Sequence, residues 1–391
     1  MRDYYDCIVV GGGPGGAWAA KYAAEGGASV LLLEKDREVG VPVRCAEAVG
    51  ERGLNLVVKP DPRWITTIIE TAVLVSPSGK EVVMESGQER GYMLDRKIFD
   101  YDLVQMATMQ GVNVRTKAYV YDVIKPNGAV EGIRVQHLGR NYDIRAKVVI
   151  GADGVESRVG RWAGLRTNMK IRDLESCIQM TLSNIGVDPN TIYFYFGRDV
   201  APGGYLWIFP KNDRVANVGL GVSGEYSRKK SAKRYLQEFL GKHFPNAAVL
   251  YTVVGGVPCA PTLKKIVGDG LMLVGDAAHQ VNPMSGGGIV TAMIAGQIAG
   301  RVAASAIMEN DVSEKRLQKY ADEWHKAEGK THERFYKIKQ SVYKLTDEDL
   351  DKTAETVLSL PPDKRTIINI FKAALRKHPK LVLDVLKVFM T

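Results

Sequence analysis

Residues 6–34, DCIVVGGGPGGAWAAKYAAEGGASVLLLE, constrain the fold more than any other part of the chain. The apolar run at 7–10 predicts a buried strand, and a helix-forming segment and a second apolar run follow it. Between the first strand and the helix, Gly11, Gly13 and Gly16 form the pattern GxGxxG. In this strand, turn and helix context the pattern is typical of dinucleotide binding, so we predict a βαβ unit with a phosphate site at the helix N-terminus.

Each glycine of this pattern has a physical task. Gly11 permits the tight turn, Gly13 lets a pyrophosphate reach the backbone, and Gly16 allows the helix to pack closely on the strand. Glu34 ends the second strand about 20 residues further on, where an acid hydrogen-bonds a ribose. Because a carboxylate repels a 2′-phosphate, we expect this site to disfavour NADP.

Composition and charge narrow the class of protein. A chain of 391 residues is long enough for two or three domains, and its net charge of +9 favours an acidic partner: nucleic acid, an anionic membrane or a phosphorylated substrate. No nucleic-acid-binding motif is present, so we expect no nucleic-acid partner. The four cysteines are widely separated and form no CxxC pair, which predicts a reduced, cytoplasmic chain without a metal site. The N-terminus lacks the pattern of a signal peptide, and we expect no membrane-spanning segment.

Arg96 and Cys45 leave alternatives open. Asp95 can cap a helix in whose first turn Arg96 lies, and a cation there requires an anionic partner. A cofactor phosphate or a surface ion pair would serve. Cys45 ends a glycine- and valine-broken loop, where it is either a small buried hydrophobic residue or a functional thiol.

Residues 176–221 are rich in β structure and predict a separate antiparallel layer. Within PGGYLWIFP, a strand would place Tyr205, Trp207 and Phe209 on one face. We expect Phe209 in the core, whereas Tyr205 and Trp207 carry polar tips that suit either a ligand or burial.

The C-terminal residues 366–391 predict two amphipathic segments hinged at Pro379, with Lys372, Arg376, Lys377, Lys380 and Lys387 against an apolar face. Such a basic amphipathic pattern suits an anionic membrane surface. A closing helical domain with a solvated basic face is the alternative.

With these features assembled, the chain resembles the flavoprotein superfamily of glutathione-reductase type 2 folds, which includes p-hydroxybenzoate hydroxylase. The resemblance lies in GGGPGG with Glu34, DRKIFD at 95–100, GADGVESRVGR at 151–161 and LVGDAAHQVNPMSGGGI at 273–289. Through VRCAEAVG and PGGYLWIFP it is further similar to the geranylgeranyl reductase family, above all the archaeal digeranylgeranylglycerophospholipid reductases. Ala48 stands where that family commonly has glycine.

The resemblance implies a fold of the mixed α/β (α+β) class. Residues 1–65, 92–170 and 255–310 would form a discontinuous, three-layer, Rossmann-like FAD-binding domain. Residues 66–91 and 171–254 would form an antiparallel β substrate domain, and residues 311–391 a C-terminal helical region.

The resemblance also implies the site residues. The predicted FAD contacts are Gly11, Gly13, Gly15, Gly16, Glu34, Cys45, Ala46, Ala48, Arg96, Val120, Asp153, Asp276, Gly288 and Ile289. The predicted catalytic residues are Cys45, Tyr205 and Trp207.

We therefore expect an FAD-dependent reductase of isolated C=C bonds in the geranylgeranyl chains of archaeal membrane phospholipid precursors, with a hydride from reduced flavin N5 and a proton. Its partners would be a prenylated glycerophospholipid substrate, an external electron donor (a ferredoxin-like protein or NAD(P)H) and an anionic membrane at the inner face of the cell. The alternatives are an FAD-dependent aromatic-ring monooxygenase and a non-enzymatic prenyl-lipid chaperone.

Overall fold

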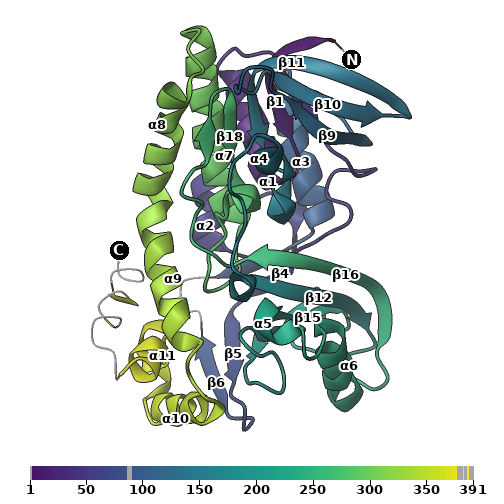
Figure 1. Cartoon of the computed structure of the whole chain (residues 1–391). Helices are drawn as coiled ribbons and strands as arrows, with labels where there is room; N and C mark the ends of the chain where they lie inside the picture. Colours follow the sequence, from purple (N-terminus) through teal and green to yellow (C-terminus); the bar gives the residue numbers. More distant parts are fainter. Residues whose placement is uncertain (1, 86–89, 377–381, 383–384, 387–391) are drawn as a thin grey trace. The chain divides into compact units, whose positions relative to one another are not determined.

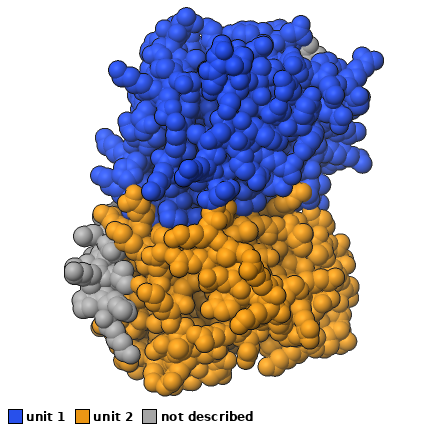
Figure 2. All heavy atoms as spheres, viewed as in Figure 1, with its two compact units in different colours: residues 1–43, 96–168, 260–332 blue, residues 44–95, 169–259, 333–391 orange. Residues whose placement is uncertain are grey.

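The computed structural model describes residues 2–85, 90–376, 382 and 385–386 (Figure 1). The chain forms two compact units. Unit 1 comprises Met1–Val43, Arg96–Asn168 and Ala260–His332, and unit 2 comprises Arg44–Asp95, Met169–Cys259 and Glu333–Thr391 (Figure 2). The predicted mixed α/β class is confirmed.

Unit 1 is built on an eight-stranded sheet with the order β17-β18-β11-β1-β2-β8, in which β10 pairs with both β11 and β9. Its strands are β1 (Tyr4–Val10), β2 (Val30–Leu33), β8 (Asn113–Arg115), β9 (Ala118–Ile124), β10 (Gly132–His137), β11 (Arg140–Gly151), β17 (Val267–Gly268) and β18 (Leu271–Leu273). The pairs of β1 with β2 and β11, of β2 with β8 and of β11 with β18 are parallel. The short apolar runs of β1, β2 and β18 are buried on both faces, as in covered parallel sheets.

The helices of unit 1 include the one that follows the glycine turn, at whose N-terminus the sequence predicts a phosphate site. They are α1 (Pro14–Glu25), α3 (Arg96–Thr108), α4 (Arg158–Trp162), α7 (Ile289–Met308) and α8 (Glu314–Trp324), with short turns η2 (Gly154–Glu156) and η4 (Gly275–Ala278) and a π-helical turn η5 (His325–Gly329). Among the described residues, α7 has the length and hydropathy of a membrane span. It is a core helix here: a Cβ on Gly296 would lie 2.3 Å from the carbonyl oxygen of Gly15, so α7 packs directly on α1.

Unit 2 contains two sheets. The seven-stranded sheet has the order β16-β12-β15-β14-β13-β5-β6, and the three-stranded sheet has the order β3-β7-β4. All of their pairs are antiparallel except β13 with β5. The strands are β3 (Ala48–Gly50), β4 (Ile65–Ile69), β5 (Thr71–Val75), β6 (Glu81–Glu85), β7 (Gly91–Leu94), β12 (Leu174–Ser183), β13 (Thr191–Tyr195), β14 (Tyr205–Pro210), β15 (Ala216–Ser223) and β16 (Ala248–Pro258).

The remaining elements of unit 2 are mostly helical. They are α2 (Glu51–Val57), η1 (Pro62–Trp64), η3 (Ile171–Asp173), α5 (Gly224–Ser227), α6 (Ala232–His243), α10 (Asp347–Leu358), η6 (Pro362–Lys364) and α11 (Ile367–Ala374), while α9 (Lys330–Val342) contains the boundary between the units. Of the predicted C-terminal basic residues, Lys372 and Arg376 are exposed, and Lys377, Pro379, Lys380 and Lys387 lie outside the described residues.

The division of the chain differs from the expected boundaries most at residues 44–65 and in the C-terminal region, and by a few residues at 92–95, 169–170 and 255–259. Residues 44–65 belong to unit 2, because β3 and β4 both pair with β7 and so complete its smaller sheet. The C-terminal helical region does not form a third unit: residues up to His332 group with unit 1 and those from Glu333 with unit 2. Backbone pairing of distant strands decides the first of these boundaries, and the second lies within the continuous helix α9.

The two faces of the seven-stranded sheet have different partners. One face, with Ile178, Leu206 and Leu220, packs with α6 through Leu236 and Phe239. The opposite face carries a second cluster of Trp207 and Phe209 with Ile69 and Met93, and with partly buried Ala46, Ala48, Cys177, Ile192, Phe194 and Tyr205. This second face holds every residue predicted to be catalytic except Cys45, whose neighbour Ala46 packs on it.

Candidate functional site

The glycine turn of unit 1 has the geometry that its sequence predicts. Gly11 has φ +110°, and a Cβ on it would lie 2.2 Å from the carbonyl oxygen of Ala152. A Cβ on Gly16 would lie 1.9 Å from the carbonyl oxygen of Gly11. Gly13, the N-cap of α1, has nothing within 4 Å of its Cβ position. The backbone is therefore accessible at Gly13 alone of these three, where a pyrophosphate would approach.

Glu34 is oriented by two backbone amides. Its Oε2 accepts a hydrogen bond from the N–H of Gly12 at 2.8 Å, and its Oε1 accepts from the N–H of Asp36 at 2.9 Å. The carbonyl of Glu34 accepts from the N–H of Ala118 at 2.9 Å, which places the start of β9, the strand of Val120, beside the end of β2. A carboxylate oxygen has two lone pairs, so the fixed carboxylate retains acceptor capacity for ribose hydroxyls.

Arg96 has a carboxylate partner within its own helix. Its Nε and Nη2 donate to Asp100 Oδ1 and Oδ2 at 2.6 and 2.8 Å, and the two side chains are 12% and 6% exposed. Arg96 and Asp100 therefore form a buried bidentate ion pair. The sequence had suggested either a cofactor phosphate or a surface ion pair as the partner of Arg96. The predicted contact of Arg96 with FAD stays a prediction.

Two half-buried acids, Asp276 and Asp153, follow strands β18 and β11 of the sheet. Burial raises the pKa of Asp276 to about 6, and Arg96 opposes the shift. The Cβ position of Gly288, the N-cap of α7, is 3.5 Å from Asp276 Oδ1, so this acid lies at the start of the helix that Ile289 begins. Asp153 Oδ2 accepts from the N–H of Val159 at 3.0 Å, and Oδ1 is buried without a hydrogen-bond partner among the described residues. Burial raises the pKa of Asp153 as well.

These features fit an FAD-sized dinucleotide. The open backbone at Gly13, the N-termini of α1 and α7, and the unsatisfied Asp153 oxygen are all groups that a bound nucleotide and its polyol chain can satisfy. Gly15 has a packing task in addition, since its Cβ would lie 3.2 Å from the carbonyl oxygen of Ala292 in α7.

In unit 2, β14 presents a row of aromatic rings. Tyr205 and Trp207 contact edge to face with centroids 5.9 Å apart, and Phe194 contacts both Tyr205 and Phe209 at 5.4 Å. Gly219 lies opposite Trp207 on β15, and a Cβ on it would lie 2.5 Å from the indole. The predicted shared face of Tyr205, Trp207 and Phe209 is confirmed, and Phe209 is buried in the core.

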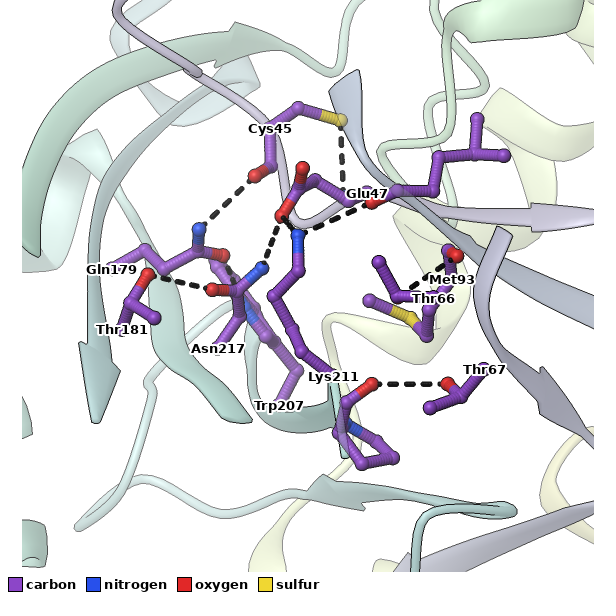
Figure 3. A network of polar contacts seen from close by, with 12 residues as sticks. Cys45, Glu47, Thr66, Thr67, Met93, Gln179, Thr181, Trp207, Lys211 and Asn217 are labelled. Atoms are coloured by element: carbon purple, nitrogen blue, oxygen red, sulfur yellow. Dashed lines mark hydrogen bonds and ion pairs between the residues drawn. The ribbon is translucent and has the colours of Figure 1, made fainter. Parts of the chain in front are cut away.

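A chain of hydrogen bonds links this row to Cys45 (Figure 3). The indole N–H of Trp207 donates to Gln179 Oε1 at 2.9 Å, and Gln179 Nε2 donates to the carbonyl of Cys45 at 3.0 Å. The N–H of Glu47 donates to Cys45 Sγ at 3.2 Å. Both the backbone and the sulfur of Cys45 are therefore held in place.

Glu47 anchors the same loop from inside unit 2. It has φ 76° and is 4% exposed. Its Oε2 accepts from Lys211 Nζ at 2.6 Å and from Asn217 Nδ2 at 2.7 Å (Figure 3). Thr181 donates to Asn217 at 2.8 Å, and Lys211 also donates to the carbonyl of Leu94 at 3.3 Å. This network fixes a left-handed residue two positions after Cys45.

Residues 6–200 match the family of FAD-dependent oxidoreductases, and residues 173–257 match the geranylgeranyl reductase catalytic domain. The chain is 44% identical to digeranylgeranylglycerophospholipid reductase 2 of Methanococcoides burtonii, over 100% of this chain and 97% of that protein. It is 45% identical to digeranylgeranylglycerophospholipid reductase of Methanocella arvoryzae, over 98% of each chain.

The chain belongs to the digeranylgeranylglycerophospholipid reductase family. Among solved structures, a geranylgeranyl bacteriochlorophyll reductase-like protein from Thermoplasma acidophilum is 37% identical with a TM-score of 0.91, covering 99% of this chain and 100% of that one. A flavin-dependent brominase, 18% identical with a TM-score of 0.72 over 96% of this chain and 100% of its own, shares the fold. The protein is thus a flavin-dependent oxidoreductase with FAD as cofactor, as the sequence motifs indicated.

The reductase's predicted site residues are distributed over both units. Unit 1 carries Gly11, Gly13, Gly15, Gly16, Glu34, Arg96, Val120, Asp153, Asp276, Gly288 and Ile289, and unit 2 carries Cys45, Ala46, Ala48, Tyr205 and Trp207. Within unit 2 the structure brings Cys45, Ala46, Tyr205 and Trp207 together. Their individual roles stay predictions.

The structure also adds residues to the reductase's site that sequence reasoning missed. Around Tyr205, three cysteines distant in sequence, Cys45, Cys177 and Cys259, lie close enough with Glu175 to raise the pKa of its hydroxyl, although burial is the largest cause. No group of three or more His, Cys, Asp or Glu side chains in the described part of the chain could hold a metal ion. The sequence could have pointed to Glu47 and Lys211 as site residues. Glu47 lies within the motif VRCAEAVG, and Lys211 directly follows the motif PGGYLWIFP.

Proposed function

We infer that the protein is an FAD-dependent reductase that saturates isolated C=C bonds of geranylgeranyl chains in an archaeal membrane phospholipid precursor. The observation that carries this inference is the near-full-length identity of 44–45% with digeranylgeranylglycerophospholipid reductases. The apolar aromatic face of the seven-stranded sheet suits a prenyl chain, which offers no polar group to bind.

The chemistry explains the aromatic rings. When bound and reduced, the flavin supplies a hydride to one alkene carbon, and the other carbon takes a proton. Positive charge develops at the more substituted carbon, and aromatic faces stabilise a desolvated cation by about 2 kcal/mol. That stabilisation corresponds to a rate increase of more than about tenfold. Tyr205 and Trp207 are the residues that we propose for this role, and Gln179 orients the indole.

Cys45 is the proposed proton donor or relay beside the substrate. Replacing Cys45 with alanine is expected to spare FAD binding, since the nucleotide fingerprint lies in unit 1, and to abolish most turnover. Flavin absorbance per mole of protein and the rate of substrate saturation measure the two effects. An unchanged rate would remove Cys45 from the mechanism.

A direct test of the function uses anaerobically reduced holoenzyme and a geranylgeranyl glycerophospholipid. We expect the lipid to reoxidise the flavin and to gain two hydrogens per bond by mass spectrometry. Oxygen incorporation coupled to NADPH oxidation would instead favour an aromatic-ring monooxygenase. Purification of a colourless protein that binds the lipid unchanged would favour a prenyl-lipid chaperone.

The electron donor and the cellular site belong to the same proposal. One dinucleotide fingerprint serves FAD, so electrons would come from a ferredoxin-like protein or from transiently bound NAD(P)H. The net charge of +9 and the exposed Lys372 and Arg376 support peripheral binding at the inner face of the membrane by a cytoplasmic protein. Cosedimentation with anionic but not zwitterionic vesicles is the expected result, and equal binding to both would contradict it.

A further inference from the structure

A buried acid in unit 2 has no role in the chemistry described so far. Glu175, in β12, is 6% exposed. Its Oε1 accepts a hydrogen bond from the hydroxyl of Tyr343 and lies 3.4 Å from Lys339 Nζ. Lys339 is itself buried and donates to the carbonyl of Cys259 at 2.8 Å. Glu175 Oε2 is buried and has no hydrogen-bond partner among the described residues.

The oxygen without a partner lies beside the aromatic row. Cys177 and Tyr205 both pair with Gly221, one from each side of β15. The side-chain position that Gly221 leaves empty is bordered by Cys177 Sγ at 3.2 Å and by Glu175 Cβ at 3.6 Å. The Cβ position of Gly204, directly before Tyr205, is 3.4 Å from Glu175 Oε2. Glycines at 204 and 221 therefore let Oε2 approach the Tyr205 end of β14.

These surroundings favour the neutral acid. A carboxylate would leave charge on a buried oxygen without a donor, which is costly. Burial accordingly raises the pKa of Glu175 to about 7, even though Lys339 and Tyr343 act in the opposite direction. The ionisable groups that face this cluster are Lys339 and Tyr343 from and after α9, Asp173 from η3, Cys177 from β12, Tyr205 from β14, Cys259 after β16, and Cys45.

We propose that Glu175 supplies the proton that each double-bond saturation consumes, passing it through the Tyr205 hydroxyl; this inference rests on the proposed function. The Cys45 thiol gives its proton to the alkene carbon, and the Tyr205 O–H reprotonates the Cys45 sulfur. Glu175 Oε2–H, which makes no hydrogen bond to the described residues in the resting structure, rotates to reprotonate the Tyr205 oxygen. The hydride from the reduced flavin completes the new pair of C–H bonds, so the alkene gains two hydrogens and Glu175 becomes a carboxylate. The Tyr343 hydroxyl and the Lys339 ammonium then stabilise that carboxylate until solvent returns a proton.

The first test replaces Glu175 with glutamine in the full-length holoenzyme, with Glu225→Gln as a control at an exposed position. We expect E175Q to bind FAD normally and to lower kcat for geranylgeranyl lipid saturation about 100-fold, the lower range for general acid catalysis, with little change in KM. The wild-type rate should fall as the pH rises through about 7, and E175Q should lose that fall. Unchanged kcat and pH profile in E175Q would overturn the proposal.

A second readout does not depend on turnover. Because folded Glu175 keeps its proton to a higher pH than the 4.5 of an ordinary glutamate, its contribution to stability is present at low pH and is lost as the pH rises from about 4.5 through about 7. The melting temperature of the wild type should therefore fall more steeply across this range than that of E175Q. A carboxylic-acid infrared band at pH 6 that E175Q lacks should accompany it, and identical stability profiles and spectra would refute the proposal.

If E175Q does not fold, the variant Tyr343→Phe provides an independent test. Since the Tyr343 hydrogen bond lowers the pKa of Glu175, its removal should move the descending limb of the rate profile to higher pH. No shift, or a shift to lower pH, would contradict the proposal. A wild-type enzyme that never saturates the lipid would instead disprove the proposed function, whatever the variants show.

Discussion

Replacing Gly16 with valine is expected to prevent unit 1 from folding around FAD. A Cβ at this position would lie 1.9 Å from the carbonyl oxygen of Gly11, and it would also come within 3.1 Å of the Ala152 side chain. Neither backbone segment can withdraw, because Gly11 is itself confined by Ala152 and β1 is paired on both sides. Overpacking in an interior costs about 1–3 kcal/mol even where neighbours can move, and here the contact is with backbone. We expect colourless or insoluble protein, measured by flavin absorbance and soluble yield.

Gly13→Ala is the matched control for this variant. Its Cβ position is empty to 4 Å, so the fold should tolerate the methyl group and the melting temperature of the apoprotein should change little. FAD affinity should nevertheless fall, because the added group occupies the space through which a pyrophosphate reaches the backbone. If G16V bound FAD as well as the wild type, the helix packing described for this turn would be incorrect.

Replacing Lys211 with methionine is expected to destabilise unit 2 by about 3–5 kcal/mol, the cost of removing one partner of a buried ion pair. Glu47 is 5% exposed at its side chain and Lys211 is 19% exposed, and their charged atoms are 2.6 Å apart. Asn217 would still donate to Glu47 Oε2, but a neutral amide does not replace the charge of the Lys211 ammonium. Because Glu47 also holds Cys45 Sγ through its N–H, we expect turnover to fall along with stability. Chemical denaturation and the rate of lipid saturation measure the two effects.

Lys352→Met provides the comparison. Lys352 pairs with Glu348 at 2.5 Å in α10, but the two side chains are 55% and 75% exposed. Exposed pairs contribute about 0–1 kcal/mol, so this variant should retain nearly full stability and activity. The double variant Glu47→Gln with Lys211→Met should recover part of the lost stability, since it also removes the buried negative charge of Glu47. Equal losses of stability in K211M and K352M would show that the buried ion pair stabilises the protein no more than the exposed one.

Local patterns were enough to predict several elements correctly. The βαβ unit at the start of the chain and the shared face of Tyr205, Trp207 and Phe209 follow from glycine spacing and from period-two alternation. The compact units of the structure divide the chain at residues other than the expected domain boundaries. No local pattern in residues 44–65 indicates that β3 and β4 pair with β7, because strand pairing between distant segments carries no short-range signature.

Some residues of the candidate site could be found from the sequence, and others could not. Cys45, Tyr205 and Trp207 were found from motifs, whereas Glu175, Gln179 and Lys211 were not. Gln179 and Glu175 alternate with apolar residues in an ordinary strand, and only the order β12-β15-β14 brings them level with the aromatic row. The carboxylate partner of Arg96 proved to be a buried neighbour one helical turn away.

The sequence by itself determined the nucleotide fold, the cofactor class and the aromatic strand. Glycine spacing, apolar runs and period-two alternation are patterns of a few neighbouring residues, and each of them specifies a local backbone structure. The tertiary structure alone decided that Cys45, Cys177, Cys259 and Glu175 surround Tyr205, and that Glu47 and Lys211 share a buried charge. Sheet order sets these distances, and burial then sets the protonation of the acids. The distances between these side chains and the protonation of the acids are therefore set only after the strands have paired.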